Sequence, residues 1–309
     1  MSFKHIIGND AIKKLLTNSV ISNNVLHSYM FIGEDGIGKF LFASTFAQMI
    51  LCENNSKLSP PCENCKSCIE FTTNNHPDFF VVNPEDNKII KIEQVRFLQK
   101  KISEKPISSK KKVYIINDSH LMTKEAQNCL LKTLEEPPEY AVLILVLPDE
   151  SKILNTIKSR CTKINFQKLS NKEIVDYFHF NEQDFQINDN ILKACNGSIS
   201  KALKLQNDAI VYEDLNKIIN SFNNKDIIDI WNNSEILYKS KDNINDLLEY
   251  INIVFMEKLQ ETHDIKYGNC IKLVENTKSR LQTNANYDMS IDTLLLDIWR
   301  EFNEEHYRG

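Results

Sequence analysis

The stretch Gly33-Glu-Asp-Gly-Ile-Gly-Lys39-Phe40 follows the phosphate-binding pattern G-x-x-x-x-G-K-[ST] at every position except the last. In such a loop the glycines allow successive backbone N–H groups to face the phosphates, the Lys reaches the β and γ oxygens, and the Ser or Thr hydroxyl binds Mg²⁺. Gly33, Gly36, Gly38 and Lys39 provide the first two parts, whereas Phe40 has no oxygen to offer a metal. The stretch predicts the shape of a nucleotide loop without its metal ligand.

The residues around this stretch favour a strand, then the loop, then a helix. Tyr29-Met-Phe-Ile32 is apolar enough for a buried strand, and residues 42–51 have the apolar content of a packed helix. A phosphate loop requires this setting, so a Gly-rich turn without function is the weaker interpretation.

Further apolar runs alternate with helical patterns in the front half of the chain, which indicates an α/β fold with a parallel sheet buried on both faces. Asn9 or Asp10 is placed to cap a first helix. Residues 123–136 carry the i, i+3, i+4 spacing of a packed helix, which Pro137-Pro138 ends. The additional strands are expected at 79–82, 113–116, 141–147 and, with a weaker pattern, 162–166.

The rear half lacks the residues that punctuate strands and turns. All 8 prolines lie at or before Pro148, and the glycines after Gly38 are Gly197, Gly268 and Gly309. Strand-and-turn architecture needs such breakers, so the rear half is predicted to be almost entirely helical.

Composition describes a soluble globular protein, with 42% hydrophobic and 26% charged residues in 309. No apolar run approaches the roughly 20 residues that span a bilayer, and the N-terminus lacks a signal-peptide pattern, so we expect a cytoplasmic protein without membrane contact. The net charge of −5 is uneven: residues 1–167 hold 21 Lys and Arg against 18 Asp and Glu, and the remainder holds 16 against 24. The acidic rear half disfavours nucleic-acid binding there.

Four cysteines follow the expected loop helix at spacings that suit a metal: Cys52, Cys62, Cys65 and Cys68. Four thiolates close a tetrahedron around Zn²⁺ and leave no open position for water, which predicts a structural zinc site. A disulfide is disfavoured without a secretory signal. An iron–sulfur cluster is the stronger rival, although the fourth Cys of ferredoxins lies downstream rather than upstream. The other four cysteines are expected to be small apolar packing residues: Cys129, Cys161, Cys195 and Cys270.

A second nucleotide motif is degenerate in the same way as the first. In nucleoside triphosphatases an apolar strand ends in acidic residues that hold Mg²⁺ and polarise the attacking water. Here the strand Val113-Tyr-Ile-Ile116 ends in Asn117-Asp118, so a neutral amide stands where the metal carboxylate belongs. Phe40 and Asn117 together indicate that hydrolysis has been lost.

Four features in combination resemble the bacterial clamp-loader AAA+ proteins. They are Leu26-His-Ser-Tyr-Met-Phe31, the four-Cys insert, the segment Leu130-Leu-Lys-Thr-Leu-Glu-Glu-Pro-Pro138 and the triplet Ser159-Arg160-Cys161. The resemblance is dense over residues 5–166, thin over 167–205, and beyond that rests on helical character alone. Within the family, the degenerate loop and acidic pair resemble a subunit that does not hydrolyse ATP.

The resemblance implies three domains: an AAA+ nucleotide-binding-fold domain over 1–167 with a Cys₄ zinc module at 52–68, a helical lid over 168–207 and a helical oligomerisation collar over 208–309. It also implies that Arg160 acts as an arginine finger, reaching the ATP of a neighbouring subunit and offsetting charge on the transferred phosphoryl group. The family lid carries Gly-Ser-x-Arg, but this chain has Gly197-Ser-Ile-Ser200. Whether ATP binds the degenerate loop is left open.

The function that the resemblance implies is a non-hydrolysing scaffold, or stator, in the DNA polymerase III clamp loader. Its partners would be tau/gamma-type ATPase subunits and the delta subunit, with the sliding clamp and primer-template DNA contacted through the complex. An active tau/gamma-type motor is the alternative, and it would explain why Lys39 and the glycines are present. A free-standing zinc-containing DNA-binding protein is a third, which the negative net charge disfavours.

A basic stretch runs from Lys88 to Lys112, with nine Lys and Arg against Glu93 and Glu104. Cations that face the chamber of a ring would contact DNA phosphates without reading sequence. The other interpretation is that these residues lie on a solvent-exposed helix face and beside a strand, as runs of charged residues usually do.

Overall fold

The computed structural model describes residues 3–54, 61–86, 88–180, 189–223, 228, 230, 231, 234–283 and 285–303. The chain forms two compact units, one of Met1–Gln183 with Gly197–Ser200 and the other of Asp184–Asn196 with Lys201–Gly309. Residues 55–60 of the expected zinc module and 181–188 of the expected lid lie outside the described part.

The first unit is built on a five-stranded parallel sheet in the order β2-β3-β4-β1-β5. Every residue of the two strands β3 and β4 is buried. Such strands, covered on both faces, read as continuous apolar runs rather than as alternating ones, and this confirms the predicted parallel sheet. The strands are β1 (Ser28–Ile32), β2 (Phe79–Val82), β3 (Lys112–Ile116), β4 (Ala141–Leu147) and β5 (Thr162–Asn165).

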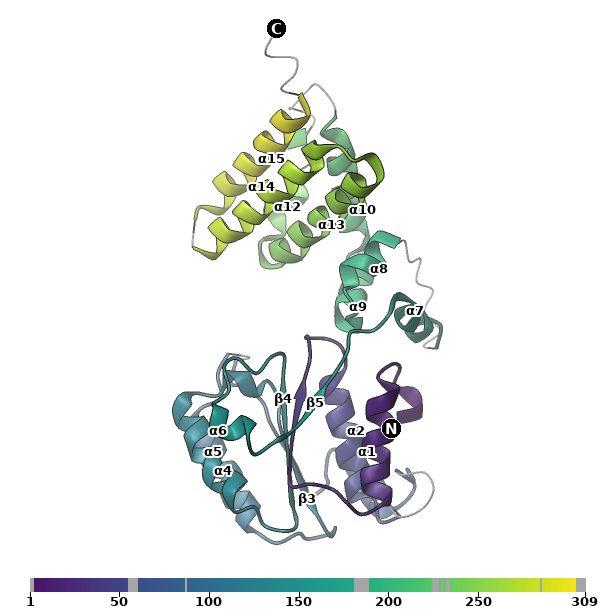
Figure 1. Cartoon of the computed structure of the whole chain (residues 1–309), viewed down its shortest axis with the longest axis vertical. Helices are drawn as coiled ribbons and strands as arrows, with labels where there is room; N and C mark the ends of the chain where they lie inside the picture. Colours follow the sequence, from purple (N-terminus) through teal and green to yellow (C-terminus); the bar gives the residue numbers. More distant parts are fainter. Residues whose placement is uncertain are drawn as a thin grey trace. The chain divides into compact units, whose positions relative to one another are not determined.

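Helices cover both faces of this sheet (Figure 1). α1 (Asp10–Ile21) and α2 (Lys39–Leu51) lie on one face, where Phe31, Phe42 and Phe46 belong to one buried cluster. The other face packs against α4 (Ile92–Ser103), α5 (Lys124–Glu135) and the short α6 (Asn155–Lys158). The remaining elements of this unit are η1 (Phe3–His5), α3 (Lys66–Thr72), η2 (Ser119–Leu121) and α7 (Asn171–Phe180).

Two local expectations need correction. The helix after the phosphate loop begins at Lys39 rather than at residue 42, because Gly38 in the left-handed region already turns the chain into the helix. Asn9 precedes α1, but its side chain does not cap that helix. Its Oδ1 accepts from the backbone N–H of Gln167 at 2.9 Å and its Nδ2 donates to the carbonyl of the same residue at 3.1 Å. Asn9 therefore ties the start of α1 to the chain just beyond β5.

Every regular element described after β5 is helical, as the absence of proline and the small number of glycines predicted. The long antiparallel helices α13 and α14 pack side by side with α15 (Figure 1). The elements are α8 (Asp189–Cys195), α9 (Ile199–Asn207), α10 (Ala209–Ser221), α12 (Glu235–Lys239), η3 (Lys241–Asn243), α13 (Ile244–Thr262), α14 (Ile265–Gln282) and α15 (Tyr287–Asn303).

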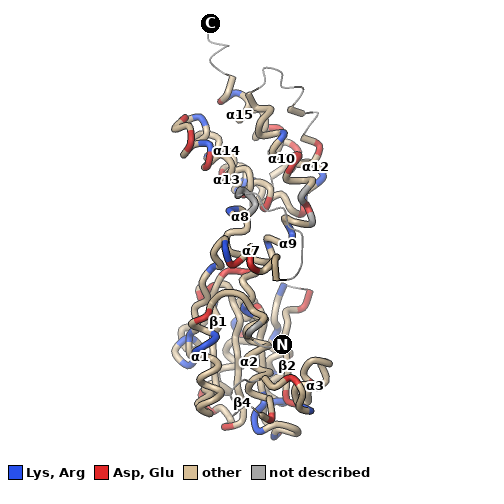
Figure 2. Tube along the Cα trace, turned by 90° about the vertical axis from the view of Figure 1, so that its right-hand side faces the viewer, with Lys and Arg blue, Asp and Glu red and all other residues tan. Residues whose placement is uncertain are grey.

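The apolar stripes that the sequence shows in this region form the core of the second unit. Leu247, Leu248 and Ile251 of α13 are buried, as are Leu294 and Ile298 of α15. Figure 2 marks the basic and acidic residues along the helices of this unit, and on α14 the side chain of Lys278 pairs with Glu275 at 2.8 Å. Among the described residues, no helix is both long and apolar enough to cross a membrane.

Candidate functional site

The phosphate loop lies between the end of β1 and the start of α2, as its strand-loop-helix setting predicts. Gly36 and Gly38 have φ angles of 79° and 91°, a backbone region that side chains disfavour. A Cβ atom at Gly36 would lie 2.2 Å from Oγ of Ser198. Gly36 is thus required both by the turn and by the close approach of a second segment.

The Lys39 side chain is folded back onto its own loop. Its Nζ donates to the carbonyl oxygens of Gly33 at 2.5 Å and Glu34 at 2.7 Å, and it lies 3.3 Å from Oδ1 of Asp35. Only 6% of the residue is exposed, and this burial lowers the pKa of Lys39 below its ordinary value. An ammonium group has three donors, so the acceptors of the loop occupy all of the hydrogen bonds that Lys39 would offer to phosphate.

The segment Gly197–Ser200 covers the same loop. The backbone N–H of Ser200 donates to the carbonyl of Gly36 at 3.3 Å, and Ser198 is almost fully buried. Ser200 stands where the family resemblance expects an Arg, so a short hydroxyl side chain lies at the loop in place of a cation. Lys201, the neighbouring cation, lies in the second unit and pairs with Glu249 at 3.3 Å.

The acidic pair after β3 is degenerate in structure as well as in sequence. Nδ2 of Asn117 donates to Oδ2 of Asp118 at 3.0 Å, so the amide binds the one carboxylate that remains. The negative charge of Asp118 favours the protonated form of Lys39. Phe40 is 40% exposed and offers no ligand atom. Neither predicted metal-holding position supplies a carboxylate or a hydroxyl.

Arg160 lies in the turn between α6 and β5, and its backbone is held in place by a hydrogen bond. Oγ of Ser28 donates to the Arg160 carbonyl at 2.6 Å. The guanidinium donates through Nη1 to the carbonyl of Thr156 at 2.8 Å and through Nη2 to Oε1 of Glu135 at 2.9 Å. Its side chain is 35% exposed. In the described part of the chain its side-chain partners lie outside the phosphate loop of the same molecule.

The four clustered cysteines converge as their spacing predicts. Cys52 ends α2, Cys65 caps α3, Cys68 lies within α3, and Cys62 precedes it. Their Sγ atoms all lie within 4.8 Å of one another. Zn–S bonds of about 2.3 Å place tetrahedral sulfurs about 3.8 Å apart, so a slight contraction would close the cluster on an ion. The cluster can hold a metal, and four soft sulfur donors suit zinc.

The surroundings of the cluster also suit a bound cation. Burial raises the pKa of the Cys52 and Cys68 thiols, because a thiolate without a partner is unfavourable in a buried site. A bound metal ion provides that partner and releases the protons of the thiols. Backbone N–H groups of Cys62 and Cys68 donate to the sulfurs of Cys52 and Cys65, each at 3.4 Å. Such donors stabilise charged sulfur ligands.

The remaining cysteines are free thiols. Cys161, Cys195 and Cys270 are buried, in agreement with a packing role. Cys129 is only partly buried, and its Sγ donates to Oε1 of Gln99 at 3.1 Å.

A family model described as "DNA polymerase III, delta subunit" matches residues 8–170 of the chain. The chain belongs to the DNA polymerase III clamp-loader subunit family. The matched residues include the phosphate loop, the four clustered cysteines, the Asn117-Asp118 pair and Arg160.

Two relatives from Bacillus subtilis carry different subunit names. The chain is 38% identical to DNA polymerase III subunit delta' over 165 residues, which are 53% of this chain and 49% of that protein. It is 30% identical to DNA polymerase III subunit tau over 276 residues, or 85% of this chain and 47% of that protein. The chain thus spans about half the length of these relatives. A solved structure of a DNA polymerase III gamma subunit-related protein from Thermotoga maritima aligns with a TM-score of 0.49 and 18% identity, covering 94% of this chain and 99% of that one.

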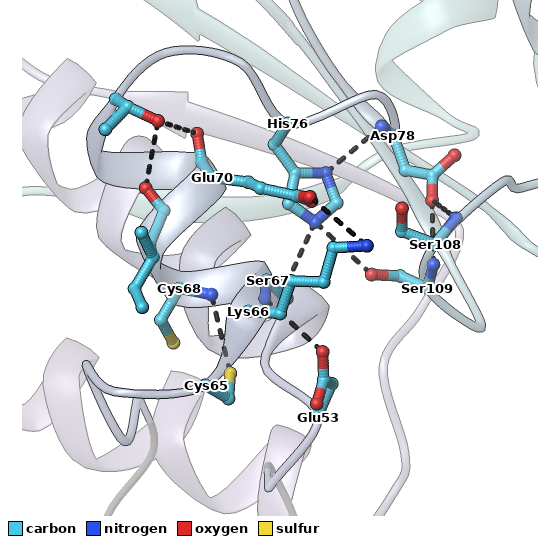
Figure 3. Close-up of polar contacts among 12 residues, drawn as sticks. Glu53, Cys65, Lys66, Ser67, Cys68, Glu70, His76, Asp78, Ser108 and Ser109 are labelled. Carbon is cyan, nitrogen blue, oxygen red and sulfur yellow. Dashed lines mark hydrogen bonds and ion pairs between the residues drawn. The ribbon is translucent and has the colours of Figure 1, made fainter.

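This clamp-loader chain also contains a buried polar network that the sequence analysis missed (Figure 3). Oγ of Ser67, between two of the cysteines, lies 2.9 Å from Nε2 of His76. The Asp78 N–H donates to Nδ1 of the same ring at 3.1 Å. The Asp78 carboxylate, which is fully buried, accepts from the backbone N–H groups of Ile107, Ser108 and Ser109 at 2.8 Å each.

The network joins the cysteine cluster to the loop before β3. Because Nδ1 of His76 accepts, the neutral ring carries its proton on Nε2 and donates toward Ser67 or Ser109. The one signal in the sequence is His76-Pro-Asp78 directly before an apolar strand, where a carboxylate is unexpected.

Some cations of the 88–112 stretch are buried or bonded to other groups of the chain, and others are exposed. Lys112 is buried, and its Nζ donates to the carbonyls of Lys101 and Glu104. Lys91 pairs with Glu85 at 2.6 Å, and Lys111 donates to the Glu139 carbonyl. Lys112 is therefore removed from any phosphate-binding surface, and the stretch offers fewer exposed cations than its composition indicates.

Proposed function

We propose that this chain is the non-hydrolysing scaffold subunit of a bacterial DNA polymerase III clamp loader, the role of a delta' subunit. The observation that carries the proposal is the Lys39 ammonium bound to Gly33 and Glu34 of its own loop. Phe40 and Asn117 support it, because neither residue supplies the oxygen ligand that Mg²⁺ needs. Such a subunit would have no ATPase activity of its own and would be a cytoplasmic component of the replication machinery.

In this role Arg160 is the group that the chain gives to catalysis. It would reach the γ-phosphate of ATP held by a neighbouring tau/gamma-type subunit and offset the charge that develops during phosphoryl transfer. Its position outside the phosphate loop of its own chain and its 35% exposure suit a contact with another subunit.

The other parts of the chain would hold the assembly together. We assign a structural Zn²⁺ to Cys52, Cys62, Cys65 and Cys68, since four thiolates leave no place for a reactive water. The chain would have three domains, an AAA+ domain at 1–167, a lid at 168–207 and a collar at 208–309. Through the complex it would contact the delta subunit, the sliding clamp and primer-template DNA. The exposed cations of the 88–112 stretch would face DNA only within that complex.

An active tau/gamma-type motor is the second candidate. Lys39 and three loop glycines favour it, as does the similarity to a tau subunit over 85% of the chain. The motor would bind Mg²⁺-ATP in the loop that Lys39 and the Gly197–Ser200 segment now fill.

The test is reconstitution of the loader with its own tau-type ATPase and delta subunits and with Arg160→Ala in this chain. We expect normal assembly and slower clamp loading. The amplitude of the burst of ATP hydrolysis should fall by the contribution of one ATP site, because only the site next to this chain loses its arginine finger. Lys152→Ala, an exposed cation one helix away, is the matched control. Unchanged hydrolysis by an assembled Arg160→Ala loader would remove the finger role, and turnover that requires Lys39 of this chain would favour the motor.

A further inference from the structure

Two of the segments that carry the family resemblance meet in one ion pair. Glu135 belongs to the segment Leu130–Pro138 and Arg160 to the triplet Ser159-Arg160-Cys161. Nη2 of the arginine lies 2.9 Å from Oε1 of Glu135, and Nη1 lies 2.8 Å from the Thr156 carbonyl. Two acceptors from two different helices therefore fix the plane of the guanidinium.

The position of Glu135 is unfavourable for an acid. It is the last residue of α5, where the carbonyl groups of the helix point outward and repel negative charge. Glu136 adds a second carboxylate, and Pro137 prevents the helix from continuing. Both partners of the pair are partly exposed, at 35% and 51%, and such pairs contribute little to folding stability. Stability thus gives no account of an acid at this site.

We propose that Glu135 is a positioning residue for the finger Arg160, an inference that rests on the proposed function. A guanidinium has five N–H donors, and Glu135 with Thr156 uses two of them. The other three N–H groups would then bind phosphate oxygens of the neighbouring subunit. Because the backbone is fixed through Ser28 and the side chain through Glu135, Arg160 loses little rotational freedom when it binds.

The pair acts on catalysis rather than on nucleotide affinity. An arginine that contacts the developing charge stabilises the transition state more than the bound ATP, so misplacement lowers kcat and leaves KM nearly unchanged. Glu135→Gln keeps an oxygen acceptor of the same length, whereas Glu135→Ala removes it.

The experiment uses the reconstituted loader with four variants of this chain: Glu135→Ala, Glu135→Gln, Arg160→Ala and the double variant of Glu135→Ala with Arg160→Ala. We expect Glu135→Ala to slow ATP turnover at the adjoining site about ten- to hundredfold without a change in KM. Glu135→Gln should recover most of the rate. The double variant should match Arg160→Ala, because Glu135 acts only through that arginine. Glu136→Ala, one residue along and also exposed, is the control and should equal wild type.

The outcomes separate this inference from the proposed function. If Arg160→Ala slows turnover but Glu135→Ala equals wild type, the positioning role is wrong and the finger role stands. If Arg160→Ala has no effect, the finger role itself fails. A full additional loss in the double variant would mean that Glu135 acts by another route, and faster turnover with Glu135→Ala would mean that the pair restrains Arg160. Either result overturns the proposal.

Discussion

The Nζ atom of Lys39 lies 2.5 Å from the carbonyl oxygen of Gly33, inside the loop whose phosphate it would otherwise contact. A nucleotide that entered this loop would have to break this bond and the bond to Glu34, and would meet Ser198 and Ser200 beside Gly36. In an active ATP site, the contacts of the lysine and of a bound Mg²⁺ with the phosphates offset the loss of these hydrogen bonds. Here Phe40 and Asn117 cannot provide the second part.

We therefore expect calorimetric titration of the isolated chain with ATP to show no binding that Mg²⁺ strengthens. The reason is the missing oxygen at Phe40 and the neutral amide at Asn117. A double variant, Phe40→Thr with Asn117→Asp, should gain Mg²⁺-dependent binding because it restores both ligands. Tight ATP binding by the wild type that increases with Mg²⁺ would contradict this and place the motor ahead of the scaffold.

Zinc removal should destabilise the first unit. We expect about one Zn²⁺ per chain by atomic spectrometry and four thiols that become titratable only after chelation. Cys65→Ser should lose the metal, since it removes one of four ligands and the cap of α3. Cys129→Ser, outside the cluster, is the control that keeps it. A metal-free protein that is fully folded and exposes all four thiols would refute the zinc site. Visible absorption typical of an iron–sulfur cluster would show that the four cysteines hold such a cluster instead of zinc.

Asp78→Asn tests the network in Figure 3. The carboxylate accepts three backbone N–H groups at 2.8 Å, and an amide in its place would turn a donor toward at least one of them. Hydrogen bonds to a charged group contribute about 1.5 to 3 kcal/mol each, so we expect a loss of about 3 kcal/mol in the free energy of unfolding.

Urea unfolding measures this loss, and hydrogen exchange at residues 107–109 should rise with it. Glu139→Gln, an exposed acid just before β4, should change neither quantity. An Asp78→Asn protein as stable as wild type would mean that the three bonds contribute nothing to folding.

Local patterns predicted what depends on local physics. The apolar runs located all five strands, and the absence of proline after Pro148 with few glycines after Gly38 indicated helices, because both signals come from neighbouring residues. The convergence of four cysteines followed from their spacing. The signals that failed are non-local. Asn9 is of a residue type that often caps helices, but its side chain bonds to the backbone of Gln167, which is 158 positions away. No local pattern predicts which of these two hydrogen bonds the side chain forms.

The orientation of charged side chains was equally beyond the sequence. The loop pattern assigns Lys39 to phosphate, yet the choice between phosphate and the Gly33 carbonyl depends on how far the loop is closed by Ser198 and Ser200. Likewise, Glu135 and Arg160 were each recognised as part of a motif, but their pairing depends on the packing of α5 against α6.

His76 should make stability depend on pH. Burial lowers the pKa of His76 below its ordinary value of about 6.5, and the nearby carboxylates of Asp78 and Glu70 offset only part of this effect. Between the folded pKa and about 6.5 the unfolded chain binds more protons than the folded one, so the free energy of unfolding rises with pH across that window and is constant above it. Protonation would also place an N–H on Nδ1, facing the Asp78 N–H.

The measurement is the difference in unfolding free energy between wild type and His76→Asn from pH 5.5 to 8. Asn keeps an oxygen near the position of Nδ1 but does not titrate, so the difference isolates the histidine, and acid release of zinc affects both proteins alike. We expect wild type to lose stability relative to His76→Asn as the pH falls below about 6.5. His179→Asn, an exposed histidine on α7, should leave the wild-type slope unchanged. Parallel curves for wild type and His76→Asn would show that His76 titrates in the folded protein as it does in the unfolded chain.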